Sequence, residues 1–370
     1  MDRRKFVQAA GLAGAAGVLT ACQGRDAASH CADGGGERIE WKMVTAWPRD
    51  FPGLGSGANK LAEYIDRLSN GRLKVKVYGG GELVPPFEVF DAVSRGTAQM
   101  GHSTAYYWKG KAPAAQFFCS APFGLTATEI NGWLYYGGGL ELYREVYAPF
   151  GLLPFPAGNS GTQMGGWFNK EINTLADIKG LKMRIPGLGG EILQRAGGTP
   201  VTTPGAEIFT ALQTGTIDAT EWVGPWNDLA FGLFRAGKYY YYPGWQETGS
   251  TIEALVNREA YEALPKDLQA VVEIAAQAVN TDMLADFTFH NTQALRSLEQ
   301  DHGVQLRRFP DEVMVEMRRL AWSYFEETAA GDPLFAKVFK AYRDYYEAIK
   351  PYTHISEQAV YRLRDIGTGG

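Results

Sequence analysis

The sequence lacks the residue clusters on which most enzyme and metal centres depend. Its 370 residues include only three cysteines and five histidines. The histidines are scattered, and neither a Gly-x-Ser-x-Gly nor a His-Glu-x-x-His motif is present, so a serine hydrolase or a zinc peptidase is not indicated. Cys119 lies in an apolar run and is expected to be buried and unreactive; a disulfide with Cys31 is the alternative in an oxidising compartment.

Long apolar runs and an excess of positive charge are lacking as well. Apart from the N-terminal segment, no apolar stretch reaches about 18 residues, so no transmembrane helix is predicted. The formal net charge is -5 and no basic stripe is present, which argues against a nucleic-acid partner. Glycine, by contrast, is abundant at 45 residues and falls in turns and loops. A chain of this length suits two lobes better than one core.

The N-terminus has the features of a targeting segment. A twin-arginine pattern at residues 3–7 precedes an apolar run at residues 9–20 that is too short to span a bilayer. Leu19-Thr20-Ala21-Cys22 then resembles a bacterial lipobox, so residues 1–22 are predicted to be a signal peptide, with lipid attached to Cys22. Simple cleavage, with Cys22 incidental, is the alternative. Residues 23–37 are predicted to be a flexible linker.

An internal repeat predicts two related α/β lobes. Residues 87–100 align without gaps to residues 206–219 and match at five positions, and each segment is typical of a helix, a Gly cap and a buried strand. The alternative is that this unit recurs in any α/β protein. A helix from Pro265 to about residue 298 would be roughly 50 Å long and could lie against both lobes. Residues 311–364 are predicted to form amphipathic helices.

Polar side chains follow apolar or Gly-rich segments at three places. Arg184 ends a strand that Pro186 stops, Glu221 and Trp222 follow a strand-like run, and Gln163 follows a Gly-rich loop. Open α/β sheets present ligand-binding residues from such positions, and a guanidinium can bind a carboxylate through two parallel hydrogen bonds. If the lobes are related, Tyr106 and Tyr107 close over the ligand from the opposite side, although each could equally be an ordinary core or surface aromatic.

Segments 158–167, 175–184 and 215–222 resemble the DctP solute-binding proteins of tripartite ATP-independent periplasmic (TRAP) transporters, and their residues resemble the branch that binds 2-oxo acids such as pyruvate. The resemblance implies an α/β, two-lobed periplasmic-binding-protein fold with a long spanning helix and C-terminal helices. It also implies a periplasmic location, delivery of the ligand to TRAP membrane subunits, and a homodimer formed through the C-terminal helices.

Charge balance then predicts a metal cation. A 2-oxo acid and Glu221 would place two desolvated negative charges beside the single positive charge of Arg184, which is unfavourable. Hard oxygen ligands suit such an ion, and the resemblance implies Na⁺, with Ca²⁺ as a variant. The expected ligand-binding residues are Arg184, Gln163, Asn159, Tyr106, Tyr107 and Trp222; the expected cation ligands are Gln163, Glu221, Trp222 and, from the resemblance, Gln246.

The sequence therefore predicts a binding protein that captures a small monocarboxylate outside the cytoplasmic membrane. Two alternatives stay open: an exported metal-assisted enzyme, a lyase or hydrolase, that acts on a small carboxylate, and a structural or adhesive lipoprotein. The expected lobes are residues 38–160 with about 250–285, and residues 161–249 with about 286–345; residues 346–370 would form a C-terminal helical extension.

Overall fold

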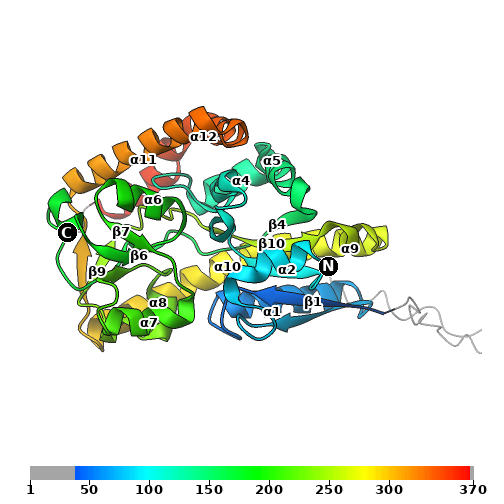
Figure 1. The fold of residues 1–370 in the computed structure, drawn as a ribbon. Helices are drawn as coiled ribbons and strands as arrows, with labels where there is room; N and C mark the ends of the chain where they lie inside the picture. Colours follow the sequence, from blue (N-terminus) through cyan, green and yellow to red (C-terminus); the bar gives the residue numbers. More distant parts are fainter. Residues whose placement is uncertain (1–37, 367–370) are drawn as a thin grey trace, which may run out of the picture. The chain divides into compact units, whose positions relative to one another are not determined.

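Two β-sheets with matching strand orders organise the computed structural model, which describes residues 38–366 (Figure 1). The predicted signal peptide, Cys22, the linker and Cys31 lie outside the described residues. Along the first sheet the order is β2 (Leu73–Tyr78), β1 (Ile39–Thr45), β3 (Met100–Ser103), β10 (Thr251–Asn257) and β4 (Leu152–Asn159). Along the second it is β11 (Gln305–Arg308), β9 (Tyr239–Tyr242), β5 (Gly166–Phe168), β8 (Ala219–Thr220), β6 (Lys182–Arg184) and β7 (Thr199–Val201).

The two sheets share one topology. In each, three parallel strands (β2, β1, β3 and β7, β6, β8) are followed by one antiparallel strand, β10 or β5. The chain passes from the first sheet to the second between β4 and β5, and returns between β9 and β10. This confirms the α/β fold class and shows that neither sheet is built from one contiguous stretch of sequence.

The internal repeat corresponds to equivalent elements of the two sheets. Helix α2 (Val89–Ser94) leads into β3, and helix α7 (Gly205–Gln213) leads into β8. Both turns contain a glycine with positive φ, 75° at Gly96 and 72° at Gly215. A left-handed backbone favours glycine because it has no Cβ atom, so the two matched glycines reflect the same turn geometry.

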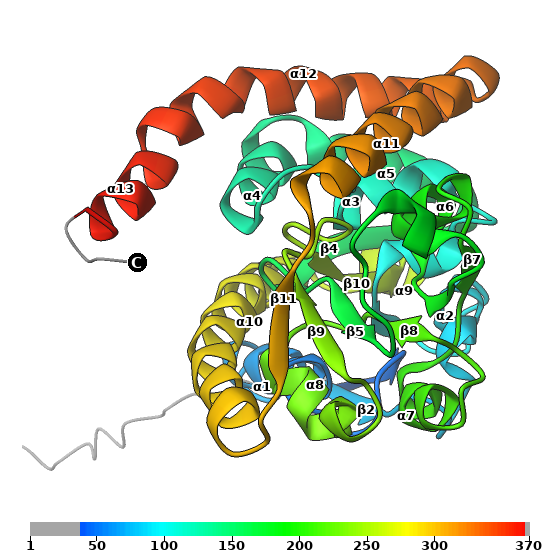
Figure 2. The ribbon, with the colours of Figure 1, turned by 90° about the vertical axis from the view of Figure 1, so that its left-hand side faces the viewer.

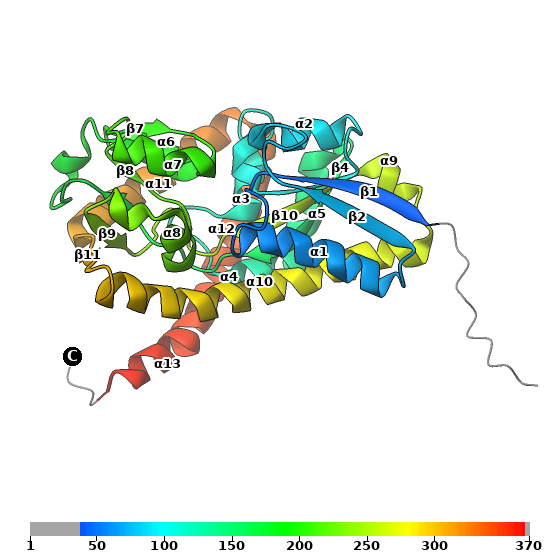
Figure 3. The same ribbon diagram turned by 90° about the horizontal axis from the view of Figure 1, so that it is seen from below.

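Helix α10 (Lys266–Gln300) is the predicted spanning helix. Its 35 residues are about 52 Å long at 1.5 Å per residue. It packs against β4 and α1 (Leu54–Leu68) of the first sheet's layer and α8 (Pro225–Phe231) of the second, as Figure 3 shows from below. Val272, Val279 and Met283 are among its buried residues, at the spacing that places side chains on one helix face.

Two C-terminal helices lie over the helices of both layers (Figure 2). Helix α11 (Asp311–Gly331) packs on α6 (Gly187–Arg195), and α12 (Pro333–Ile355) packs on α3, α4 and α5. The predicted boundary between residues 345 and 346 falls inside α12, and the lobe boundaries stay a prediction. The remaining helices are α3 (Gln116–Cys119), α4 (Ala127–Tyr136), α5 (Gly139–Tyr147), α9 (Arg258–Glu262) and α13 (Glu357–Arg364).

Two further expectations concern membrane spans and Cys119. In the part of the chain that the structure describes, no helix combines the length and the apolar character that crossing a membrane requires. Cys119 is buried and free, and its sulfur lies 2.9 Å from the Thr104 hydroxyl. The expectation of a buried Cys119 is therefore confirmed.

Candidate functional site

Arg184 and Glu221 emerge side by side because their strands are parallel neighbours. In the β6–β8 register Arg184 lies opposite Thr220, so both strands end at the same edge of the second sheet. The Glu221 amide donates to the Arg184 carbonyl at 3.1 Å, which continues the pairing for one more residue. Pro186 then prevents β6 from continuing. Pairing of parallel strands thus places a guanidinium beside a carboxylate.

The Arg184 guanidinium is buried and bonded to acceptors on three sides. Nη1 donates to the Glu221 carboxylate and, at 3.2 Å, to the Glu221 carbonyl. Nε donates to the Thr203 carbonyl at 3.3 Å, and Nη2 donates to the Tyr107 hydroxyl at 3.3 Å. Both charged side chains are at most 1% exposed, so water does not screen the ion pair.

Trp222 forms the wall on which the guanidinium rests. The Arg184 Cζ atom lies 5.1 Å from the centroid of the Trp222 ring, a cation–π distance. The benzene ring of the indole packs at Gly205, where a Cβ atom would lie 2.6 Å from Cη2. The indole Nε1 is buried and has no hydrogen-bond partner among residues 38–366, so it remains a free donor.

The first sheet contributes its own aromatic residues to the site. Tyr106 and Tyr107 lie in a short 3-10 helix, Ala105–Trp108, that follows β3. The structure thus places Tyr107 against Arg184, from the opposite sheet, as the internal repeat predicts. Trp47, after β1, lies 6.3 Å from both the Tyr107 ring and the Trp222 ring, measured between centroids. Contact of either tyrosine with a ligand stays a prediction.

Glu247 is a site residue that the sequence reasoning missed. Its carboxylate is 4% exposed and accepts hydrogen bonds from the Gln163 amide at 2.8 Å, from the Ser250 hydroxyl and from the Tyr106 hydroxyl. Burial raises its pKa to about 7, against the lowering effects of Ser250 and Arg184. Its position next to the nominated Gln246 was the one sequence signal for Glu247, but sequence adjacency does not determine the direction of a side chain.

Gln163 and Gln246 both point their amide nitrogens at protein acceptors. Gln163 Nε2 donates to Glu247 and to the Ser160 hydroxyl at 3.1 Å, and Gln246 Nε2 donates to the Met164 carbonyl at 2.9 Å. An ionised carboxylate and a carbonyl only accept, so these contacts orient both amides. The two amide oxygens, Gln163 Oε1 and Gln246 Oε1, are consequently buried without a donor in the described part of the chain.

A third buried oxygen, Glu221 Oε2, also has no donor among the described residues. Three of the four predicted cation ligands therefore carry an oxygen to which no group among residues 38–366 donates a hydrogen bond. Buried polar atoms are normally paired, and oxygen-only ligands are those that Na⁺-like and Ca²⁺-like hard cations take. Residues 38–366 contain no cluster of three or more His, Cys, Asp or Glu suited to a metal, so the donor set fits a hard cation rather than zinc or iron.

Asn159 has a more local role in the structure. Its Oδ1 accepts from the Gly161 amide at 2.8 Å, and its Nδ2 lies 3.5 Å from the Gly249 carbonyl. The side chain thereby joins the end of β4 to the loops that carry Gln163 and Glu247. These bonds show how Asn159 supports the site, and its predicted contact with a ligand remains a prediction.

The site has two buried carboxyl groups, Glu221 and Glu247, and one buried arginine, Arg184. Burial raises the pKa of Glu221 well above its usual value, although the neighbouring Arg184 favours the ionised form. Glu247 also raises the pKa of Glu221, and no described lysine or arginine forms an ion pair with Glu247. When both carboxyl groups are ionised, the site has one cationic side chain for two anionic ones, which leaves room for a bound positive ion.

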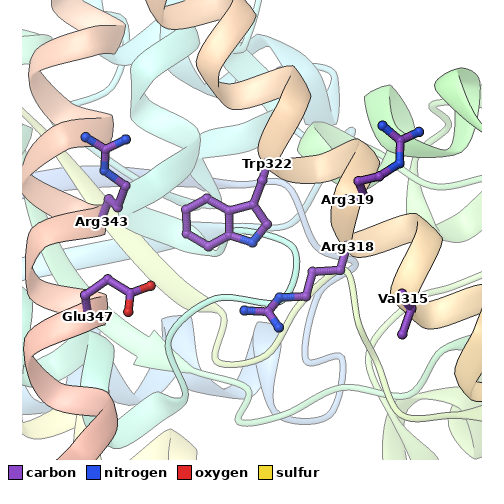
Figure 4. Close-up of a pocket in the computed structure, with 6 residues that line it drawn as sticks. All are labelled: Val315, Arg318, Arg319, Trp322, Arg343 and Glu347. Carbon is purple, nitrogen blue, oxygen red and sulfur yellow. The ribbon is translucent and has the colours of Figure 1, made fainter.

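A separate hollow lies between α11 and α12 (Figure 4). It has a volume of about 450 Å³ and is open to solvent. None of the predicted site residues lines it. Its lining residues are Val315, Arg318, Arg319, Trp322, Arg343 and Glu347.

Comparison with known proteins identifies relatives over nearly the whole chain. Residues 43–332 match the family described as bacterial extracellular solute-binding protein, family 7, or DctP. A monocarboxylate 2-oxoacid-binding periplasmic protein of Nostoc sp. is 41% identical over 357 residues, which cover 96% of this chain and 97% of that protein.

Solved structures share the fold. A TRAP periplasmic solute binding protein from Pseudoalteromonas atlantica T6c, with bound sodium and pyruvate, is 42% identical, with a TM-score of 0.86; the match covers 88% of this chain and 99% of that one. A TRAP transporter solute binding protein from Bordetella bronchiseptica RB50, a mixed occupancy dimer with copurified calcium and picolinate, is 35% identical, with a TM-score of 0.88; the match covers 90% of this chain and 100% of that one.

The raised pKa of Glu247 predicts a pH-dependent stability. A carboxyl group with a raised pKa stabilises the folded state fully below its unfolded pKa of about 4.5, and this contribution is lost as pH rises through about 7. Glu247→Gln, which imitates the protonated acid, should therefore have the same free energy of unfolding as the wild type near pH 4.5. It should exceed the wild-type free energy of unfolding by on the order of 3 kcal/mol above pH 7. Urea denaturation of the ligand-free protein across this range measures the difference, and a constant difference at all pH values would contradict it.

Proposed function

Because the chain belongs to the bacterial extracellular solute-binding protein family 7 (DctP), we propose that it captures a small 2-oxo acid, such as pyruvate, together with a metal cation. It then delivers the ligand to the membrane subunits of a TRAP transporter. One observation supports this most directly: a buried guanidinium is paired with Glu221, and three buried oxygen atoms, on Glu221, Gln163 and Gln246, have no donor among the described residues. An anion and a cation bound together would satisfy both sets of groups.

The ligand's carboxylate binds Arg184 in this proposal. A guanidinium offers paired N–H donors that match a carboxylate, and burial strengthens the interaction. The free indole N–H of Trp222 supplies one more donor to the ligand, and Tyr106 and Tyr107 cover it from the side of the first sheet. Such a small ligand must use every contact, because binding energy is limited to about 1.5 kcal/mol per non-hydrogen atom.

The cation is held by the oxygens of Gln163, Glu221 and Gln246 and by the Trp222 carbonyl. When bound, it supplies positive charge that balances Glu221 and the ligand's carboxylate. The relatives with bound sodium and with bound calcium support either ion. To the predicted set we add Glu247, whose carboxylate orients Gln163 and adds negative charge beside the ion.

Two lobes, one around each sheet and with the boundaries predicted from the sequence, close around the ligand. Contacts between the sheets' layers flank the site in the described structure. Asn227 donates to the Pro52 carbonyl at 3.0 Å, the Phe51 and Phe231 rings stack at 4.2 Å, and Lys109 pairs with Glu191. Such contacts would be broken on opening, so closure presents a changed surface to the transporter.

The site is one for binding and not for turnover. The family is one of transporter solute-binding proteins, and pyruvate incubated with the purified protein and either cation should be recovered unchanged. Recovery of a product would instead favour the metal-assisted enzyme that the sequence left open.

Export to the periplasm agrees with the family and with the named relatives. We propose further that Cys22 carries lipid and anchors the protein to the membrane. The mass of the mature protein tests this: a lipidated N-terminal cysteine should be found, whereas cleavage without added lipid would contradict the anchor.

The C-terminal helices are proposed to mediate a homodimer. Helix α13 has no buried residue, and apolar side chains of α12 and α13 are exposed, with Ile355 at 74% and Leu363 at 63%; Ile366, just after α13, is 72% exposed. Exposed apolar side chains gathered on one segment are typical of interaction sites. The Bordetella relative described as a dimer supports a second copy as the occupant.

Arg184→Ala should weaken pyruvate binding by several kcal/mol, because it leaves the ligand's carboxylate buried without its charged partner. Arg184→Lys is the matched variant; it keeps the charge, lacks the paired donors, and should lose part of the affinity. Calorimetry in sodium or calcium chloride measures both, after removal of copurified ligand. Near-wild-type affinity in Arg184→Ala would overturn the role of Arg184. A wild-type protein that no 2-oxo acid stabilises against heat would overturn the function itself.

Ile355→Glu combined with Leu363→Glu should convert a dimer into a monomer, because charges would be placed in the apolar contact. Leu68→Glu, at an exposed apolar position of α1, is the control and should leave the assembly unchanged. Analytical ultracentrifugation of the exported chain distinguishes the two masses. A wild-type protein that is monomeric at all concentrations would rule the dimer out.

A further inference from the structure

We propose that Glu221 competes with the ligand for Arg184, and that this competition makes the site select carboxylic acids with a second metal-binding atom at position 2. The inference rests on the proposed function and concerns which carboxylates the same site accepts.

The guanidinium of Arg184 has little free capacity in the described structure. An arginine has five N–H donors, and four contacts of Arg184 to acceptors are formed: with the Thr203 carbonyl, the Tyr107 hydroxyl, and the carboxylate and carbonyl of Glu221. A carboxylate that binds through two parallel N–H groups needs two donors. One present acceptor must therefore leave before the ligand can bind in that way.

The Glu221 carboxylate is the acceptor that can move away from Arg184. The two carbonyl groups belong to the backbone, and the Glu221 carbonyl is fixed by the pairing of β6 with β8. Its carboxylate, by contrast, ends a flexible side chain, and one of its oxygens already has no donor among residues 38–366. If that carboxylate turns toward a cation at Gln163 and Gln246, Arg184 loses its strongest acceptor and gains a free N–H group.

A carboxylate without a cation cannot displace Glu221 favourably. The incoming negative charge would join Glu221, which forms an ion pair with Arg184, and Glu247, which forms no ion pair among the described residues. Three buried negative charges beside one positive charge are costly. The ligand must therefore bring the cation with it or help to hold it.

This requirement determines which carboxylates bind. A 2-oxo acid, a 2-hydroxy acid or a carboxylate beside a ring nitrogen offers two donor atoms to one cation. Propionate has nearly the size of pyruvate and offers only its carboxylate. Hard cations prefer several ligand atoms at once, so the first group completes the oxygen shell that Glu221, Gln163 and Gln246 begin. The site is thus expected to reject propionate although Arg184 alone would accept it.

Glu221→Gln is the variant that tests the competition. A neutral amide accepts from arginine much more weakly than a carboxylate, so Arg184 becomes available without a cation. Calorimetry should show that the wild type binds pyruvate only with sodium or calcium and prefers it to propionate by roughly 10- to 100-fold. Glu221→Gln should bind both acids with choline as the only cation, with the preference reduced to a few-fold, and added sodium or calcium should change little.

Glu247→Gln is the matched control. It removes the same charge from the same site, but Glu247 has no hydrogen bond to Arg184 among the bonds of the described residues. Because Glu247 orients Gln163, this variant should weaken cation-dependent binding of pyruvate, but it should gain no binding when choline is the only cation. Equal gains of cation-free binding in both variants would show a general effect of charge and would overturn the competition. Loss of all binding in a folded Glu221→Gln, with wild-type binding intact, would overturn it too while leaving the proposed function standing.

Discussion

The buried pair of Arg184 and Glu221 is the interaction on which the rest of the site depends. Removing two charges from water costs more than their attraction returns unless further hydrogen bonds are made. Here those bonds come from the Thr203 carbonyl, the Glu221 carbonyl and the Tyr107 hydroxyl. The pair therefore needs a second sheet that ends in register and a first sheet that supplies the tyrosine.

The shared topology of the two sheets provides both the strand register beside Arg184 and the position of Tyr107. In each sheet the parallel strands end toward the site, and the residues that follow them meet there: Tyr107 after β3, and Glu221 after β8. Close approach depends on the absence of a side chain at two glycines. At Gly166 a Cβ atom would lie 2.3 Å from the Thr220 carbonyl, and at Gly187 it would lie 2.8 Å from Tyr106. Helix α10 on one side and helices α11 and α12 on another join the two layers.

The unmatched oxygens give the site its chemical character. In most buried polar clusters each acceptor finds a donor, but at Gln163, Gln246 and Glu221 the donors are used elsewhere or are absent from the described residues. In the proposed function these oxygens are the ligands of a positive ion. Glu247 orients Gln163 and, when ionised, adds negative charge to the site. Its own burial raises its pKa.

The sequence by itself determined the classes of element and nominated the main candidate binding residues. Periodicity predicted the 35-residue α10, and the Gly-capped repeat predicted α2–β3 and α7–β8, because both signals are local. Strand ends located Arg184 and Glu221. Tertiary structure alone decided which hydrogen bonds these residues form. The Glu247 carboxylate accepts from the Gln163 amide, and the Glu221 carboxylate accepts from the Arg184 guanidinium. These contacts join residues 84 and 37 positions apart, and their side-chain directions follow from packing between loops, which no local pattern encodes.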